Sequence, residues 1–63
     1  MKAFVEKENK ELSFKSLNTK DMLKELGISS EEVLVCVNGN LVLGEHIFSK
    51  GDEVKILSVV SGG

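Results

Sequence analysis

The chain has 63 residues, which allows one small domain with little room for both a core and a preformed catalytic cleft. Eight lysines, no arginine and ten acidic residues give a net charge of −2, which excludes the basic surface typical of a direct nucleic-acid binder. The single cysteine, Cys36, excludes an internal disulfide and favours a reducing, cytoplasmic setting. No segment is apolar enough to predict a signal peptide or a membrane span.

Residues 1–7 and 10–15 alternate between apolar and polar side chains, which predicts two strands joined by a polar turn. In the first strand Ala3 and Val5 share one face, together with Met1, and Phe4 points to the opposite face. These two segments are expected to form an N-terminal hairpin.

A short helix is predicted after the hairpin. Asn18 or Thr19 can cap its first turn, and Gly27 suits a left-handed residue at its end. The helix spans roughly two turns and needs a sheet to lie against, because so short a helix is not stable alone. Its apolar stripe consists of Met22, Leu23 and Leu26.

Three further strands are predicted at residues 33–37, 41–43 and 53–60, with an Asn38-Gly39 turn between the first two. The helix supplies the long crossover that a parallel pair requires, so the first and last strands are expected to pair in parallel at the centre. The predicted fold is therefore α+β: a mixed sheet of four or five strands with one helix packed on one face. We place this domain at residues 1–60 and a flexible C-terminal tail at residues 61–63.

Three segments carry a resemblance to the β-grasp, ubiquitin-like sulfur carriers of the ThiS and MoaD families. Residues 33–39 (VLVCVNG) look like the third strand and its turn, residues 50–57 (KGDEVKIL) like the entry into the final strand, and residues 58–63 (SVVSGG) like the tail ending in Gly-Gly. Many molybdopterin-type carriers have a Pro-Pro-Val segment that this chain lacks. Its tail is more similar to the tRNA-thiolation carriers and the archaeal ubiquitin-like modifiers.

The resemblance implies a carrier that is not itself an enzyme and that binds no cofactor stably. A ubiquitin-activating, ThiF-type or MoeB-type enzyme would use ATP to adenylate the Gly63 carboxylate, and sulfur would then displace AMP to leave a thiocarboxylate. A sulfurtransferase and a thiolation or synthase enzyme would complete the set of partners. The sulfur would serve tRNA 2-thiolation or the thiazole of thiamine.

Three alternatives stay open at this point. The first is a ubiquitin-like modifier joined through Gly63 to target lysines, which begins with the same adenylate. The second is the small subunit of a molybdopterin synthase. The third is a β-grasp interaction module in which the Gly-Gly pair is incidental.

The small residues of the tail suit a sulfur carrier for a physical reason. Gly62 and Gly63 lack a Cβ, so they can thread a narrow channel in conformations closed to other residues. Ser61 continues the run of small residues. Val59 and Val60 are expected to be the last anchors before the tail and contacts to the activating enzyme.

Strand alternation places Phe4, Cys36 and Leu57 on the sheet face that the helix does not cover. Clustered exposed apolar groups mark interaction sites, so these residues are predicted to bind the partner, with Leu34 as a further member. Cys36 more often acts in such a strand as a small apolar residue than as a reactive thiol. His46 has no Cys or His partner for a metal site and is expected to be an exposed loop residue.

Overall fold

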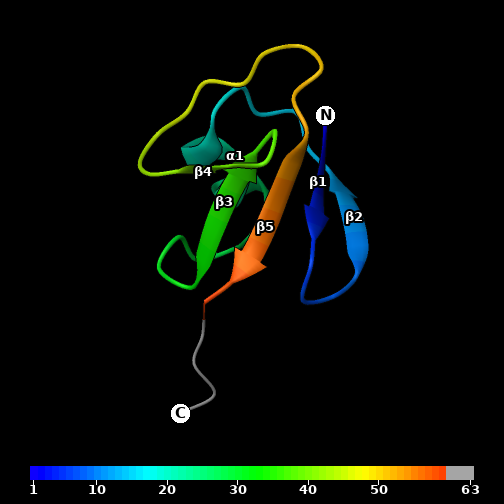
Figure 1. Ribbon diagram of the computed structural model, residues 1–63, viewed down its shortest axis with the longest axis vertical. Coiled ribbons are helices and arrows are strands. Elements are labelled where there is room, and N and C mark those ends of the chain that lie inside the picture. The colour runs from blue at the N-terminus through cyan, green and yellow to red at the C-terminus, as the bar shows by residue number, and fades with distance from the viewer. Residues whose placement is uncertain (60–63) are drawn as a thin grey trace.

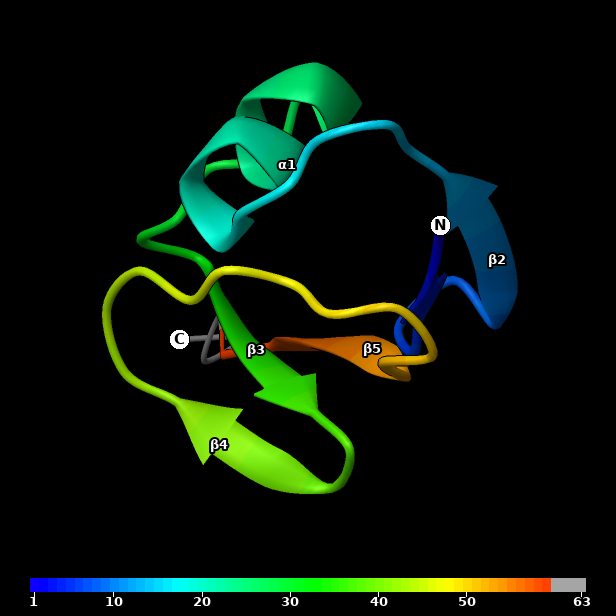
Figure 2. The same ribbon diagram turned by 90° about the horizontal axis from the view of Figure 1, so that it is seen from above.

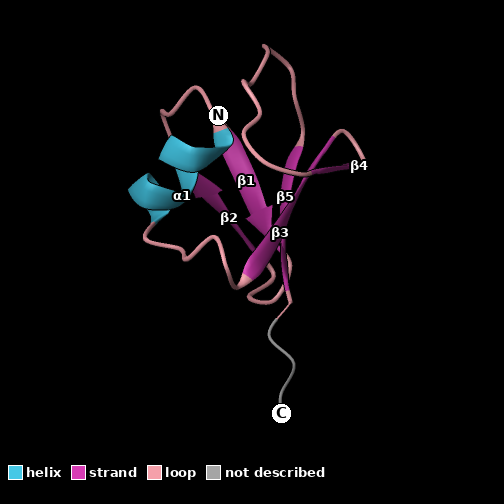
Figure 3. Cartoon of the chain, turned by 90° about the vertical axis from the view of Figure 1, so that its left-hand side faces the viewer, coloured by secondary structure: helices cyan, strands magenta, loops and turns pink. Residues whose placement is uncertain are grey.

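The computed structural model describes residues 1–59, and in this part of the chain one helix packs on one face of a sheet (Figures 1 and 3). The predicted order of elements is confirmed. The elements are β1 (Lys2–Val5), β2 (Lys10–Ser13), α1 (Thr19–Leu26), β3 (Val33–Val37), β4 (Asn40–Val42) and β5 (Val54–Ser58).

The five strands lie in the order β2-β1-β5-β3-β4. β1 and β5 pair in parallel at the centre, as predicted, and every other neighbouring pair is antiparallel. The view from above shows α1 on one side of the sheet with the other side uncovered (Figure 2). This is the mixed α+β architecture of a β-grasp domain.

The register of the three central strands explains the core. Val5, Ile56 and Val35 lie opposite one another in one row across β1, β5 and β3. The next row brings together Ala3, Val54 and Val37. All six side chains are at most 8% exposed and face α1. Met22 and Leu23 of α1 are also buried in this core, and so are Phe14 and Phe48 from the segments outside the strands and the helix.

The helix ends where local chemistry predicts. Asn18 is the N-cap, because its side-chain oxygen accepts a hydrogen bond from the backbone N–H of Asp21 at 2.8 Å. Gly27 adopts φ 72°, and the N–H of the following Ile28 donates to the carbonyl of Leu23 at 2.8 Å. This is the 6→1 bond of a Schellman ending, and it turns Ile28 back onto the core.

Glu25 holds the segment before the helix against α1. Its carboxylate accepts the hydroxyl of Ser16 at 2.6 Å and the backbone N–H groups of Lys15 and Ser16 at 3.0 Å. The hydrogen bond from the Ser16 hydroxyl, followed by that from the Lys15 backbone, holds the pKa of Glu25 below its usual value.

Several strand limits differ from the predictions. β1 is confined to Lys2–Val5, because the chain turns at Glu6 and Asn9 adopts φ 52°. Met1 lies outside the strand and is 42% exposed, so it does not extend the buried face. β5 begins at Val54 and ends at Ser58, which leaves Val59 beyond the last strand.

Candidate partner-docking face and glycine tail

The uncovered face of the sheet presents the three residues that alternation assigned to it. One row across the strands contains Phe4 of β1, Lys55 of β5 and Cys36 of β3. The adjacent row pairs Leu57 of β5 with Leu34 of β3. Phe4, Cys36 and Leu57 are half-buried and Leu34 is 37% exposed, so this face keeps accessible apolar surface that α1 does not cover.

A surface hollow of about 870 Å³ brings Phe4, Cys36 and Leu57 together. We call the surface formed by these three residues and Leu34 the docking face. Most of the other side chains around the hollow are charged. The charged ones are Lys2, Glu6, Glu11, Asp52, Glu53 and Lys55.

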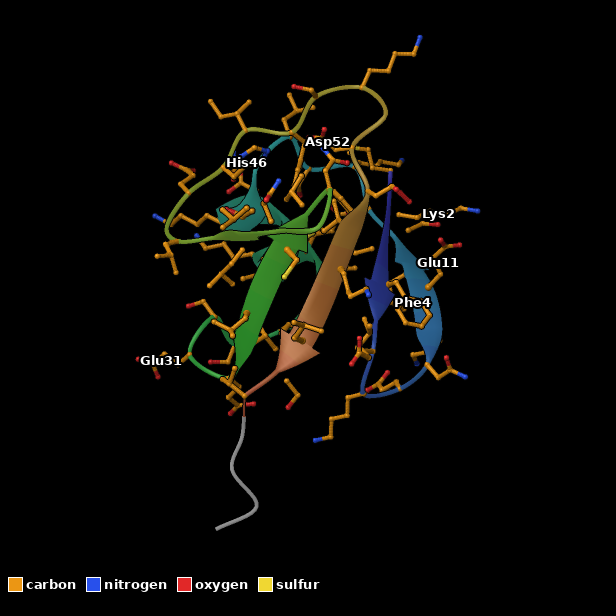
Figure 4. All side chains as sticks on the ribbon, in the orientation of Figure 1. Lys2, Phe4, Glu11, Glu31, His46 and Asp52 are labelled. Carbon is orange, nitrogen blue, oxygen red and sulfur yellow. The ribbon has the colours of Figure 1, made fainter. Side chains whose placement is uncertain are left out.

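Sequence reasoning missed these charges, although the period of two that places Leu57 outward also places Lys55 there. Lys55 Nζ lies 3.8 Å from Glu6 Oε2, and Lys2 Nζ lies 3.7 Å from Glu11 Oε1. Figure 4 shows Lys2, Glu11 and Phe4 near one another over the hairpin. Exposed pairs of this kind contribute little to folding, so both lysines are available to exchange partners when another surface docks.

The described chain ends beside the docking face. Val59 is 44% exposed, and its backbone N–H donates to the carbonyl of Glu32 at 3.0 Å, just before β3 begins. This bond continues the β3–β5 ladder one step past Ser58 and anchors the backbone of Val59 to the sheet. Val60, Ser61, Gly62 and Gly63 lie outside the described residues.

A second polar cluster lies at the opposite end of the sheet from Glu31, where Figure 4 shows His46 and Asp52 together. Asp52 accepts the backbone N–H of Ser49 at 2.8 Å and the side-chain amide of Asn38 at 3.0 Å. The hydrogen bond from Ser49, followed by that from Asn38, holds the pKa of Asp52 below its usual value. The cluster ties the β3–β4 turn to the turn before β5.

His46 lies in a loop, as predicted, but its side chain is partly buried and not freely exposed. Its side chain is 36% exposed, its ring lies 5.7 Å from that of Phe48, and its Nε2 lies 3.5 Å from Asp52 Oδ2. Its backbone N–H donates to the hydroxyl of the buried Thr19 at 3.0 Å, and Thr19 returns a backbone bond to its carbonyl. The loop between β4 and β5 is thus packed against the start of α1, a contact that no local sequence pattern indicates.

Within residues 1–59, no helix has the length and apolarity needed to cross a membrane. In the same residues, no group of three or more His, Cys, Asp and Glu side chains is arranged to hold a metal ion.

The β-grasp sheet packs one face on a helix, and its other face, to which the last strand contributes, stays accessible. This arrangement defines a small ubiquitin-like domain. The model of the ThiS family matches residues 2–63, and the chain belongs to the ThiS family. ThiS-family proteins are small carrier proteins rather than enzymes, and they generally interact with adenylating and sulfurtransferase enzymes. A comparison with solved structures finds no significant match.

Proposed function

We propose that this protein carries sulfur on Gly63 as a thiocarboxylate, with Gly63 as the carboxyl-terminal residue. The observation that carries the proposal is that the ThiS-family match extends to residue 63 and therefore includes Gly62 and Gly63. The domain in front of them supplies a surface for docking. The carrier contributes no acid, base or metal to the reaction.

The chemistry proceeds in two displacements. A carboxylate is a poor electrophile, so a carboxylate oxygen of Gly63 first attacks the α-phosphorus of ATP in the activating enzyme, and pyrophosphate leaves. Hydrosulfide then attacks the carbonyl carbon of the acyl adenylate. A C–S bond forms, the C–O bond to AMP breaks, and the proton passes to solvent. Nothing is oxidised or reduced, and the product is the Gly63 thiocarboxylate.

Two features support a docking role for the rest of the chain. The docking face places Phe4, Cys36 and Leu57 around one hollow. Val59 leaves the same sheet from the end of its central strand. An enzyme that covers the docking face would therefore lie close to the start of the segment that it must receive. Val59, Val60 and Ser61 are proposed to contact that enzyme.

The test is the intact mass of the protein after incubation with ATP, a sulfide source and a ThiF-type or MoeB-type activating enzyme. A mass increase equal to the exchange of oxygen for sulfur at the C-terminus is expected, and it should require ATP. The chain lacking Gly62 and Gly63 should gain no sulfur. Sulfur uptake by that truncated chain would overturn the proposal.

Adding target proteins or acceptor systems to the same reaction separates the alternatives. Conjugation in place of sulfur transfer would give products of higher mass with the Gly63 carboxyl joined to target lysines. Delivery to tRNA, to thiazole or to molybdopterin is distinguished by supplying each acceptor system with the purified thiocarboxylate. We place tRNA 2-thiolation and thiazole synthesis ahead of molybdopterin, because the tail lacks the Pro-Pro-Val segment.

A further inference from the structure

A second hollow, of about 670 Å³, lies between α1 and the outer part of β3, and Leu34 is the one residue of the docking face that also lines it. Leu23, Ile28 and Val33 contribute apolar surface to it, and Leu43, which is 81% exposed, stands at its rim. We call this hollow the edge groove. It is a surface that the carrier role leaves unused.

The edge groove runs along a strand edge. Three consecutive residues, Val33, Leu34 and Val35, line it, although successive side chains of a strand point to opposite faces. A hollow that touches three consecutive residues therefore faces the edge of the strand and its backbone. β4 covers this edge only from Val35 to Val37.

The backbone of Val33 is unpaired on that side within the described residues. Glu32 accepts from Val59 and Asn38 donates to Glu53, so the even-numbered residues of β3 direct their N–H and C=O groups toward β5. The odd-numbered residues consequently face β4. Beyond Val42 the chain bends away, and Gly44 lies with its carbonyl 3.4 Å from the hydroxyl of Thr19. The N–H and C=O of Val33 are left open to an added strand.

Two lysines of α1 form the opposite wall of the edge groove. Lys20 and Lys24 are four residues apart, both line the hollow, and neither forms an ion pair with a described residue. Like charges at this spacing destabilise a helix, and a cation in the first turn opposes the helix dipole. Helix stability therefore does not account for Lys20. Among the described residues that line the edge groove, Glu45 is the only acid, so the groove is positive on a chain that is negative overall.

We propose that the edge groove binds an extended segment of a partner protein in which apolar residues are flanked by carboxylates. The segment would add as a strand at the open edge of β3, with backbone hydrogen bonds to Val33. Its apolar side chains would lie on Leu23, Ile28 and Leu43, and its acids would meet Lys20 and Lys24. Peptides that add to a sheet edge take affinity from such backbone bonds and specificity from side-chain pockets. Because the edge groove shares only Leu34 with the docking face and no residue with the hollow around Phe4, Cys36 and Leu57, a second partner can hold the carrier while the activating enzyme is bound.

The experiment titrates the isotope-labelled, full-length protein with a short synthetic peptide containing a run of Val and Ile flanked by Asp on both sides. The amide signals of Val33, Lys20 and Leu23 are expected to shift the most, and those of Phe4 and Leu57 to stay in place. The amide of Val33 should exchange with solvent more slowly in the complex. A peptide with Lys in place of each Asp should bind about tenfold more weakly, since two rim ion pairs are replaced by repulsion.

Charge-reversal variants provide the matched control. Lys20→Glu with Lys24→Glu should weaken the Asp-flanked peptide about tenfold and strengthen the Lys-flanked one, and both effects should shrink at high salt. Lys7→Glu with Lys50→Glu changes the net charge equally in two turns and should leave binding within about twofold. Equal affinity for the two peptides, or shifts centred on Phe4 and Leu57, would overturn the proposal. So would concentration-dependent shifts of Val33 without peptide, which would indicate a second copy of the chain in the groove.

Discussion

Val59 donates its backbone N–H to the carbonyl oxygen of Glu32 at 3.0 Å, one step beyond the last residue of β5. This contact fixes the place at which the chain leaves the sheet, between the start of β3 and the docking face. The residues proposed to accept AMP and sulfur follow within four positions. Because so few residues separate them from this anchor along the chain, small changes in the tail should matter.

The first prediction concerns the tail itself. Gly63→Ala should lower the rate of adenylation about a hundredfold, because an added Cβ displaces the carboxylate from the position that the activating enzyme requires. Pyrophosphate release in the presence of that enzyme and ATP measures the effect. The melting temperature should not change, since the last buried core residue among residues 1–59 is Ile56. Unaltered adenylation of Gly63→Ala would contradict the need for glycine at this position.

The second prediction compares substitutions at two adjacent residues of β5, Leu57 and Ile56, whose side chains lie on opposite faces of the sheet. Leu57→Asp should weaken binding of the activating enzyme about tenfold or more and barely alter the melting temperature, because Leu57 lies on the docking face. Ile56→Ala should instead lower the free energy of unfolding by about 2–5 kcal/mol, because Ile56 is 1% exposed in the core. Calorimetric binding and urea denaturation of both variants check this. Unfolding of Leu57→Asp would place Leu57 in the core.

The third prediction concerns acid stability. The pKa of Asp52 and that of Glu25 are lowered in the folded state by hydrogen bonds to their carboxylates. Each ionised group therefore stabilises the fold above its unfolded pKa, and this contribution is lost as the pH falls below about 4 through the lower folded pKa. Asp52→Asn and Glu25→Gln should both reduce stability at neutral pH.

The difference in the free energy of unfolding between each variant and the parent protein should then shrink toward about pH 3, which is roughly one unit below the ordinary carboxyl pKa. Urea denaturation across this range measures it. Glu31→Gln is the matched control, since its carboxylate accepts no hydrogen bond in the described residues and its effect should be small at all pH values. A pH-independent effect of Asp52→Asn would show that shape, and not charge, is what the Asp52 cluster requires.

The fourth prediction concerns the start of the helix. Asn18→Ala should lower the free energy of unfolding by about 1 kcal/mol, because the N–H of Asp21 loses its acceptor. Asn18→Ser keeps an oxygen at the N-cap and should recover most of the loss. Denaturant midpoints of the three proteins provide the measurement. A deficit in Asn18→Ser equal to that in Asn18→Ala would assign Asn18 a role other than capping.

Strand alternation was sufficient to predict much of this molecule. The period of two separated Phe4, Cys36 and Leu57 from the buried Val35, Val54 and Ile56, and the structure confirms that division. It worked because each central strand packs a single face on α1. The helix ends followed from Asn18 and Gly27, whose effects are local.

The features that escaped sequence reasoning depend on contacts between distant segments. His46 and Thr19 are 27 residues apart, and the loop between β4 and β5 has no periodicity to indicate that it packs on the helix. The edge groove likewise depends on where β4 stops covering β3. The place of Lys20 and Leu43 in the edge groove therefore becomes visible only once the end of β4 is known.

The position of β5 has a mechanical consequence. It is the central strand, held by β1 on one side and by β3 on the other, and the chain continues from its end. Tension applied beyond Val59 acts lengthwise along β5 and loads both ladders in shear, so that many hydrogen bonds must yield together. An enzyme can therefore pull on the segment that follows without peeling the domain apart, because the force is shared by the strands on both sides of β5.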